Sequence, residues 1–281
     1  MAQFKTYCYE IRLLTNMHVG SGDTNYGIID KLVQRDLVTG NPSVHASSLK
    51  GALREFFTKE KGRDEKNDSF ILHVFGSDPK EKDNLKNGEY RFLSADLFLL
   101  PVRSSHQQYY LATSPQIAEG LSEKLEMLNI KSLKMGAALA TLSKKEIGEK
   151  PQIFSGVANT LLEDYSVDLT KTIEPEVAAL NTNYDNKLAL FGDNFKELAQ
   201  NLPVIARNQL DNGKSENLWY EEIVPHQSRF ITFISIPDNA ESNEHFKTFD
   251  KELTSSLIQL GANGSIGYGL CKFTKLNAEE V

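Results

Sequence analysis

Three side chains of this 281-residue chain have the chemistry for acid–base or metal work: Asp30, His18 and Glu221. Asp30 follows Gly27-Ile28-Ile29, where a glycine-rich loop becomes extended. An isolated carboxylate beside phosphates can hold a divalent metal or accept a proton from a ribose hydroxyl. His18 lies with Arg12 on the polar face of a predicted strand and is a second candidate for acid or base work. The ordinary alternatives are a turn aspartate and a structural histidine.

Glu221 and Glu222 stand at the base of a predicted hairpin, behind Trp219 and Tyr220. We expect both to be surface acids unless the fold returns them to Asp30, which spacing along the chain does not determine. No Ser-His-Asp set, HExxH or GxxxxGKS/T pattern occurs in the sequence.

Lys50 and Arg54 lie four residues apart on one face of a predicted helix that Ser47 or Ser48 would cap. Like charges at this spacing repel unless an anion lies between them, and a helix start attracts anions. Gly51 inside the helix costs on the order of 1 kcal/mol relative to alanine, which suggests a close backbone approach. The pattern favours a phosphate site, and its alternative is a solvated basic face.

A second glycine-rich loop holds Gly261, Gly264, Gly267 and Gly269, with Tyr268 among them. A helix precedes this loop and a strand follows it, which is the reverse of the order in a dinucleotide-binding fingerprint. Backbone N–H groups without side chains can instead cradle phosphates.

The formal net charge of −7 argues against a nucleic-acid binder, because such proteins usually carry a basic surplus. Net charge averages over faces, however, and Lys31, Arg35, Lys50 and Arg54 gather near the first glycine-rich loop. The sequence is therefore compatible with a local basic groove on an otherwise acidic protein. The acidic runs, at 59–86, 119–126 and 279–280, are interpreted as solvated faces that serve solubility or contact a basic partner.

Composition predicts a soluble chain with a sizeable core, because 40% of its residues are hydrophobic. No apolar run approaches the roughly 20 residues that span a bilayer, so we expect a cytoplasmic protein without a membrane partner. Cys8 and Cys271 are far apart and lack CxxC spacing, which predicts reduced, buried thiols.

Alternating and helical patterns along the chain predict an α+β fold. Period-two alternation predicts strands at 7–19, 90–102, 109–111 and 230–236, a closing strand at 270–276, and a hairpin within 202–222 that turns at Asn212-Gly213. Helical spacing predicts a helix through Leu49, Leu53 and Phe56, one at 115–128, and one through Phe249, Leu253, Leu257 and Leu260. Residues 131–183 have no clear period.

Several motifs, taken together and in order, resemble the RAMP superfamily of CRISPR proteins. They are HVGSG at 18–22, IIDKLVQRD at 28–36, TGNPSVHASSLKGALR at 39–54 and GANGSIGYGLCKF at 261–273. Within that superfamily, VFGSD at 74–78, FLSADLFLLPVRS at 92–104, LATSP at 111–115 and LWYEEIVP at 218–225 are similar to the repeated backbone subunit of the type III-B, or Cmr, effector complex.

The resemblance implies one RAMP domain over 1–281, with an RRM-like or ferredoxin-like palm, large insertions and a protruding thumb hairpin at roughly 202–222. Copies of the subunit would stack as a filament along a guide RNA, beside other Cmr subunits and a complementary target RNA. The subunit would be a metal-dependent endoribonuclease that cuts this target at regular intervals.

The resemblance also implies roles for single residues. Asp30 would be required for cutting with Mg²⁺ or Mn²⁺, as metal ligand or base, and His18 and Glu221 would be auxiliary. The expected guide contacts are Lys50, Arg54, Ser47, Ser48, Gly20, Gly22, Arg35, Gly261, Gly264, Gly267, Tyr268 and Gly269. Tyr268 departs from the family, which often has a basic residue there, so Tyr268 is expected to stack on a base instead.

Three alternatives stay open at this point. One is a purely structural guide-binding subunit whose acid is idle. Another is a guide-processing endoribonuclease of the same superfamily, which typically cuts without metal through a histidine-centred site. A nucleotide-dependent enzyme is disfavoured by the order of helix, loop and strand at the second glycine-rich loop.

Overall fold

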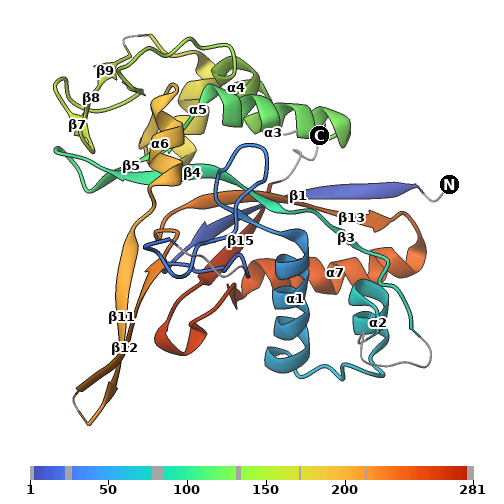
Figure 1. Cartoon of the computed structure of the whole chain (residues 1–281). Coiled ribbons are helices and arrows are strands. Elements are labelled where there is room, and N and C mark those ends of the chain that lie inside the picture. The colour runs from blue at the N-terminus through green and yellow to red at the C-terminus, as the bar shows by residue number, and fades with distance from the viewer. Residues whose placement is uncertain are drawn as a thin grey trace.

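A large mixed β-sheet organises the chain, as seen in a computed structural model (Figure 1). The structure describes residues 3–22, 27–77, 85–130, 134–170, 172–212 and 214–276. Gly213, Asp78, most of the acidic stretch before Lys86, and Glu279 and Glu280 lie outside the described residues.

The main sheet has 11 strands, and its path runs β14-β15-β1-β13-β4-β5-β10-β6-β9, with β2 on β4 and β3 on β13. These strands are β1 (Phe4–Leu13), β2 (Ser43–Val44), β3 (Arg91–Phe92), β4 (Ala95–Arg103), β5 (Tyr109–Thr113), β6 (Gln152–Ile153), β9 (Asp168–Leu169), β10 (Leu188–Leu190), β13 (Arg229–Pro237), β14 (Leu257–Gln259) and β15 (Leu270–Leu276). Two hairpins pair apart from it, β7 (Leu161–Leu162) with β8 (Tyr165–Ser166) and β11 (Val204–Asp211) with β12 (Lys214–Glu222).

Helices gather in two groups above and below the central strands as drawn in Figure 1. The lower group comprises α1 (Ala46–Glu55), the π-helical turn η1 (Phe56–Glu60), α2 (Ser69–Phe75) and α7 (Ala240–Ser255). The upper group comprises α3 (Pro115–Met127), α4 (Lys134–Leu142), α5 (Pro175–Asn183) and α6 (Asn194–Gln200). The 3-10 turn η2 (Gly264–Ile266) belongs to the second glycine-rich loop.

β1 is an interior strand of the main sheet. It pairs antiparallel with β13, where Phe4 faces Pro237, and with β15, where Cys8 faces Leu276. Both neighbouring strands come from the last fifth of the given chain. The sheet therefore joins the first strand to the last ones. Cys8 and Cys271 are buried and unbridged in these strands, as predicted, and burial raises the pKa of the Cys8 thiol to about 12.

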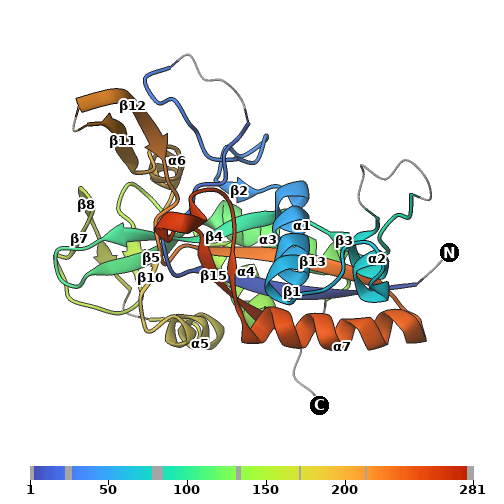
Figure 2. The ribbon, with the colours of Figure 1, turned by 90° about the horizontal axis from the view of Figure 1, so that it is seen from below.

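Helix α7 runs along one face of the sheet (Figure 2), and an aromatic core joins it to the sheet and to α2. Phe249 of α7 is fully buried and stacks on Phe57 with ring centroids 5.3 Å apart. Phe75 of α2 stacks on Phe92 of β3 at 5.5 Å, and Tyr7 of β1 stacks on Phe246 at 4.0 Å. Rings that bury on several elements at once fix how those elements pack.

The predicted α+β class and most elements are confirmed, with local corrections. The first strand ends at Leu13 rather than Val19, because the chain then makes only an isolated bridge at Met17. The last helix ends at Ser255, so Leu257 lies in β14 and Leu260 follows it. The apolar spacing continued past the helix because the short strand β14 begins almost directly after it with Leu257 and Ile258.

The predicted cap of α1 is wrong. The helix begins at Ala46 with His45 as N-cap and no side-chain hydrogen bond. Ser47 and Ser48 lie inside its first turn, and the Ser48 hydroxyl accepts a hydrogen bond from Gln34 at 2.9 Å. The hydroxyl is therefore engaged with another segment.

Residues 131–183, ambiguous in sequence, supply α4, α5 and the short strands β6 to β9 within the described part of the chain. The hairpin expected within 202–222 is present as β11 and β12, and it protrudes from the rest of the chain (Figures 1 and 2). Within the described residues, no helix combines the length and apolar character needed to cross a bilayer.

We expect Phe249→Ala to lower the free energy of unfolding by about 3–5 kcal/mol, because it empties the centre of the aromatic core. Leu257→Ala is the matched control: this side chain is 46% exposed in β14, so its loss is expected to cost less than about 1 kcal/mol. Urea denaturation of both variants measures the difference. Equal costs would contradict the assigned end of α7.

Candidate functional site

Three segments from different parts of the chain meet beyond the end of β1. Met17 bridges Val224, Gly20 bridges Val33, and Lys31 bridges Glu221 in parallel register. These bridges bring His18, Asp30 and Glu221 into one neighbourhood at the base of the β11–β12 hairpin. Sequence spacing alone did not predict this return.

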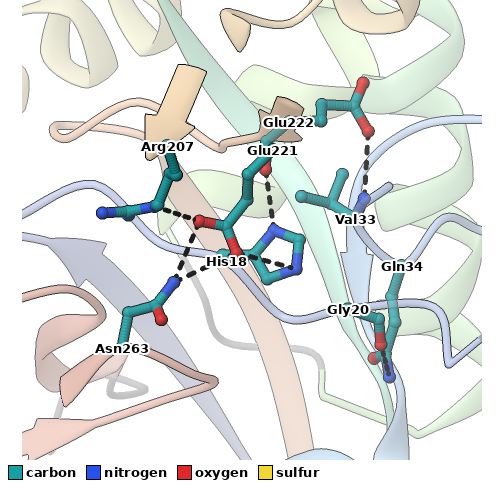
Figure 3. A network of polar contacts seen from close by, with 8 residues as sticks. All are labelled: His18, Gly20, Val33, Gln34, Arg207, Glu221, Glu222 and Asn263. Carbon is teal, nitrogen blue, oxygen red and sulfur yellow. Dashed lines mark hydrogen bonds and ion pairs between the residues drawn. The ribbon is translucent and has the colours of Figure 1, made fainter. Parts of the chain in front are cut away.

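Glu221 is the centre of a buried polar network (Figure 3). Arg207 Nε donates to Glu221 Oε2 at 2.5 Å, and Asn263 Nδ2 donates to both carboxylate oxygens at 3.1 and 3.0 Å. His18 Nε2 lies 3.6 Å from Glu221 Oε1. The network therefore joins the hairpin, the second glycine-rich loop and the segment after β1.

Burial alone would raise the pKa of Glu221, but the hydrogen bonds from Arg207 and Asn263 and the nearby His18 outweigh it and lower the pKa. Glu221 is therefore ionised at neutral pH. The fold returns Glu221 to Asp30, which was the alternative to a surface acid, and the Glu221 side chain is only 2% exposed. The His18 side chain is 4% exposed. A buried carboxylate is tolerated because its oxygens are paired.

Glu222 is also buried rather than a surface acid. Its carboxylate accepts from Arg35 at 2.5 Å and from the Val33 backbone N–H at 3.0 Å. Its backbone carbonyl accepts a hydrogen bond from His18 Nδ1 at 2.7 Å, which leaves Nε2 facing Glu221. Arg35, expected to contact RNA, is thus engaged by a carboxylate of the same chain.

Asp30 lies on the solvent side of this network and is exposed. Its Oδ2 accepts from the Tyr220 backbone N–H at 2.7 Å, and its own N–H donates to the Tyr220 carbonyl at 3.1 Å. The neighbouring Lys31 ammonium lies 5.0 Å from the centre of the Trp219 ring. Asp30 is therefore held against the backbone of β12 with its carboxylate open to solvent.

The residues around Asp30 fit a divalent cation only if most of its ligands come from elsewhere. Glu221 and Glu222 use their oxygens on Arg207, Asn263, Val33 and Arg35, as described above, so of these three acids Asp30 alone has a carboxylate open to solvent. Mg²⁺ is commonly bound by one or two carboxylates together with phosphate oxygens and water. Among the residues that the structure describes, the one cluster of three metal-capable side chains lies on α2 and α7.

The second glycine-rich loop rests directly on the segment that carries His18. Gly261 has φ +82°, and a Cβ there would lie 2.3 Å from the His18 carbonyl oxygen. Gly269 has φ +71°, and a Cβ there would lie 1.9 Å from the Leu260 carbonyl oxygen. These two glycines are required by the chain's own backbone, whereas a Cβ on Gly267 would meet nothing within 4 Å.

A polar pocket of about 240 Å³ lies where the first glycine-rich loop, α1 and the second glycine-rich loop converge. Gln34 organises it, because its Nε2 donates to Ser48 Oγ at 2.9 Å and to the Gly20 carbonyl at 3.2 Å. The lining residues are Val19, Gly20, Gln34, Val44, Ser48, Ala52, Glu55, Gln259, Leu260 and Gly261. Segments that the sequence singled out for phosphate binding thus border one cavity.

The predicted basic groove is partly neutralised. Arg54 Nε donates to Glu65 at 3.1 Å, and its Nη1 donates to the Ser77 carbonyl at 3.2 Å. Burial, with a smaller contribution from Arg54, lowers the pKa of Lys50. The contribution from Arg54 is the repulsion expected between like charges four residues apart. Among Lys31, Arg35, Lys50 and Arg54, the exposed side chain is Lys31.

Sequence reasoning missed Arg207, Asn263 and Gln34. No local motif marks them, because each acts through a partner distant in sequence. The Arg207 guanidinium also lies 4.5 Å from the centre of the Tyr268 ring. Tyr268 therefore has an arginine as a stacking partner within the chain, and its stacking on a base stays a prediction.

Comparison with known proteins agrees with this geometry. The sequence profile of the RAMP superfamily matches residues 10–272. The CRISPR system Cmr endoribonuclease Cmr4 of Pyrococcus furiosus is 27% identical over 293 aligned positions, which cover 96% of this chain and 95% of that protein.

Two solved structures share the fold. A type III-B Cmr-beta complex bound to cognate target RNA contains a chain with a TM-score of 0.78 and 24% identity, over 96% of this chain and 97% of that chain. Oligomeric Cmr4 from Pyrococcus furiosus gives a TM-score of 0.72 and 22% identity, over 97% and 99%.

Gly261→Ala and Gly267→Ala test whether the second glycine-rich loop packs closely on the backbone of His18. Both glycines have φ near +80°, so either alanine pays about 1–2 kcal/mol of backbone strain. Only at Gly261 does the new Cβ also collide with the His18 carbonyl, so we expect Gly261→Ala to cost at least twice as much. Urea denaturation compares them, and equal losses would rule out the close contact.

Proposed function

The chain belongs to the RAMP superfamily, and from that premise we propose that it is the repeated backbone subunit of a type III-B CRISPR effector complex. In this role it binds guide RNA, stacks with further copies of itself and with other Cmr subunits, and cuts complementary target RNA. The names of its relatives support RNA cleavage, the presence of target RNA and self-association: an endoribonuclease, a complex bound to target RNA and an oligomeric subunit.

Guide binding is supported by the pocket between the two glycine-rich loops and α1. The RNA backbone would bind along the pocket's polar lining. It would also contact the exposed Gly51 and the partly buried Lys50 beside that glycine. Arg54 and Arg35 are held by Glu65 and Glu222, so their part in this proposal is to shape the surface unless RNA phosphates displace those carboxylates.

One observation carries the assignment of the cleavage site: of the three candidate groups, Asp30 is exposed while His18 and Glu221 are buried. A group that touches RNA must be reachable from solvent. Asp30 is also rigidly placed, because Tyr220 holds both its carboxylate and its backbone. We therefore assign the chemistry to Asp30 and a positioning role to His18 and Glu221.

The proposed reaction is an in-line attack by a ribose 2′-hydroxyl on the adjacent phosphate. The 2′ oxygen forms a new bond to phosphorus as the bond from phosphorus to the 5′ oxygen breaks. Asp30 accepts the proton of the 2′-hydroxyl, and water returns a proton to the leaving 5′ oxygen. Lys31, beside Asp30, would stabilise the negative charge that develops on the phosphate oxygens.

A divalent cation, Mg²⁺ or Mn²⁺, would supply charge neutralisation at the scissile phosphate, with Asp30 as its protein ligand. Both roles of Asp30 use the same exposed carboxylate. The chain's own contribution is to hold that carboxylate in place through β12 and to keep the competing acids Glu221 and Glu222 occupied.

The protruding β11–β12 hairpin is the proposed thumb, and the sheet around β1 with α1 and α7 is the proposed RRM-like palm of a single RAMP domain. The hairpin reaches solvent along most of β12 and meets Asp30 at its base. Displacing one target base at this hairpin would free the neighbouring linkage to adopt the in-line geometry.

In the reconstituted complex, we expect Asp30→Asn to reduce target cleavage at least about 100-fold while target binding is retained, since the amide cannot accept the proton or hold the cation. Asp164→Asn, at an exposed aspartate in the β7–β8 turn, is the matched control and should cleave normally. Gel analysis of labelled target measures cleavage, and a filter-binding assay measures binding.

The outcomes also separate the alternatives. Full cleavage by Asp30→Asn would remove Asp30 from the active site. If the wild-type complex binds target without cutting it, with or without added Mg²⁺, the chain is a structural subunit. Cutting of repeat RNA that persists in EDTA would favour a guide-processing enzyme.

A further inference from the structure

Two histidines and two glutamates converge between α2 and α7. His73 comes from α2, Glu241 and His245 from the first half of α7, and Glu89 from the segment before β3. His73 Nδ1 lies 3.6 Å from Glu241 Oε1 and 3.7 Å from Glu89 Oε1. Ligand-capable atoms of His73, Glu241 and His245 all lie within 4.8 Å of one another.

The helical repeat explains part of this arrangement. Glu241 and His245 are four residues apart, so they project from one face of α7. That face packs on α2, where Phe70 also contacts the His245 ring with centroids 5.8 Å apart. The aromatic core thus brings His73 up to the pair on α7.

His73 is oriented by a contact on its other ring nitrogen. Nε2 lies 2.8 Å from the hydroxyl of Ser242, a fully buried residue whose carbonyl accepts from the Tyr90 hydroxyl at 2.9 Å. Metal-binding histidines commonly use their second nitrogen in this way, which fixes the ring and exposes the first nitrogen to the ion. In His73, Nδ1 is the nitrogen that faces the two carboxylates.

Glu241 belongs to the group of three ligand-capable side chains, and Glu89 adds a second carboxylate beside His73 Nδ1. Glu241 and Glu89 are 70% and 48% exposed, whereas His73 is 5% exposed. The His245 ring lies beside that of His73, with ring centroids 4.8 Å apart. The buried histidine is therefore held in place by its packing, whereas the two exposed glutamate side chains can move toward an ion.

We propose that His73, His245, Glu241 and Glu89 bind a Zn²⁺ ion that ties α2 to α7. Zinc takes imidazole nitrogen and carboxylate oxygen at about 2.0–2.2 Å in a tetrahedron, which sets neighbouring ligand atoms roughly 3.3–3.6 Å apart. The separations of 3.6 and 3.7 Å from His73 Nδ1 need only small side-chain movements to match. Mg²⁺ prefers an all-oxygen shell and fits this set poorly.

This site is separate from the proposed cleavage site. In both ribbon views α2 and the start of α7 lie at the end of the molecule away from the β11–β12 hairpin (Figures 1 and 2). The zinc ion would therefore be structural, and its loss would be read in metal content and stability. It does not depend on whether the chain cuts RNA.

The experiment uses the whole chain, stripped with a chelator and then titrated with ZnSO₄ by calorimetry, with bound zinc measured by elemental analysis after desalting. We expect one zinc per chain. At about 100 times the dissociation constant, zinc should raise Tm by about 5 °C. Glu241→Gln, which leaves the packing intact because the side chain is exposed, and His245→Ala should each weaken binding at least about 10-fold.

His106→Ala is the control, since it removes an exposed histidine elsewhere and should bind zinc like the wild type. Circular dichroism of each stripped variant verifies that it folds. Zinc binding that is absent in the wild type, or equal in the wild type, Glu241→Gln and His245→Ala, would overturn the proposal.

Discussion

A single buried carboxylate joins the parts of this molecule that matter for its proposed function. Glu221 lies at the end of β12 and is held by Arg207 of β11, by Asn263 of the second glycine-rich loop and, more loosely, by His18. Removing one partner of a buried ion pair typically costs about 3–5 kcal/mol, because a buried charge loses its compensation. The base of the hairpin, the glycine-rich loop and the segment after β1 therefore hold their positions together.

That constraint sorts the acids of the site by accessibility. Glu221 and Glu222 are paired in the interactions that position the hairpin, and of these three acids Asp30 alone presents its carboxylate to solvent. The same division applies to the cations, since Arg207 and Arg35 neutralise buried acids while Lys31 remains at the surface. Of neighbouring residues with the same charge, the buried ones thus hold the hairpin in place, and the exposed ones are those proposed to meet RNA.

Local patterns predicted the strands and helices well, because period-two and period-four burial dominates those segments. They failed where a tertiary contact decided the outcome. Leu257 continues the helical spacing of α7 yet lies in β14, and Ser48 is engaged by Gln34 instead of capping α1. The burial of Glu221 could not be predicted, because its partners Asn263 and His18 are 42 and 203 residues away in the chain. Motifs picked out the residues of the proposed site, but not the side chains that hold them.

The position of β1 has a consequence for how the chain is made in the cell. This strand is made well before its partners β13 and β15, which lie beyond residue 228. At a synthesis rate of about 5–20 residues per second, β1 waits roughly 10–45 s before β13 has been made. During that time both edges of an apolar strand are unpaired and open to wrong partners. Chaperone binding during synthesis would protect this nascent strand until the C-terminal strands arrive.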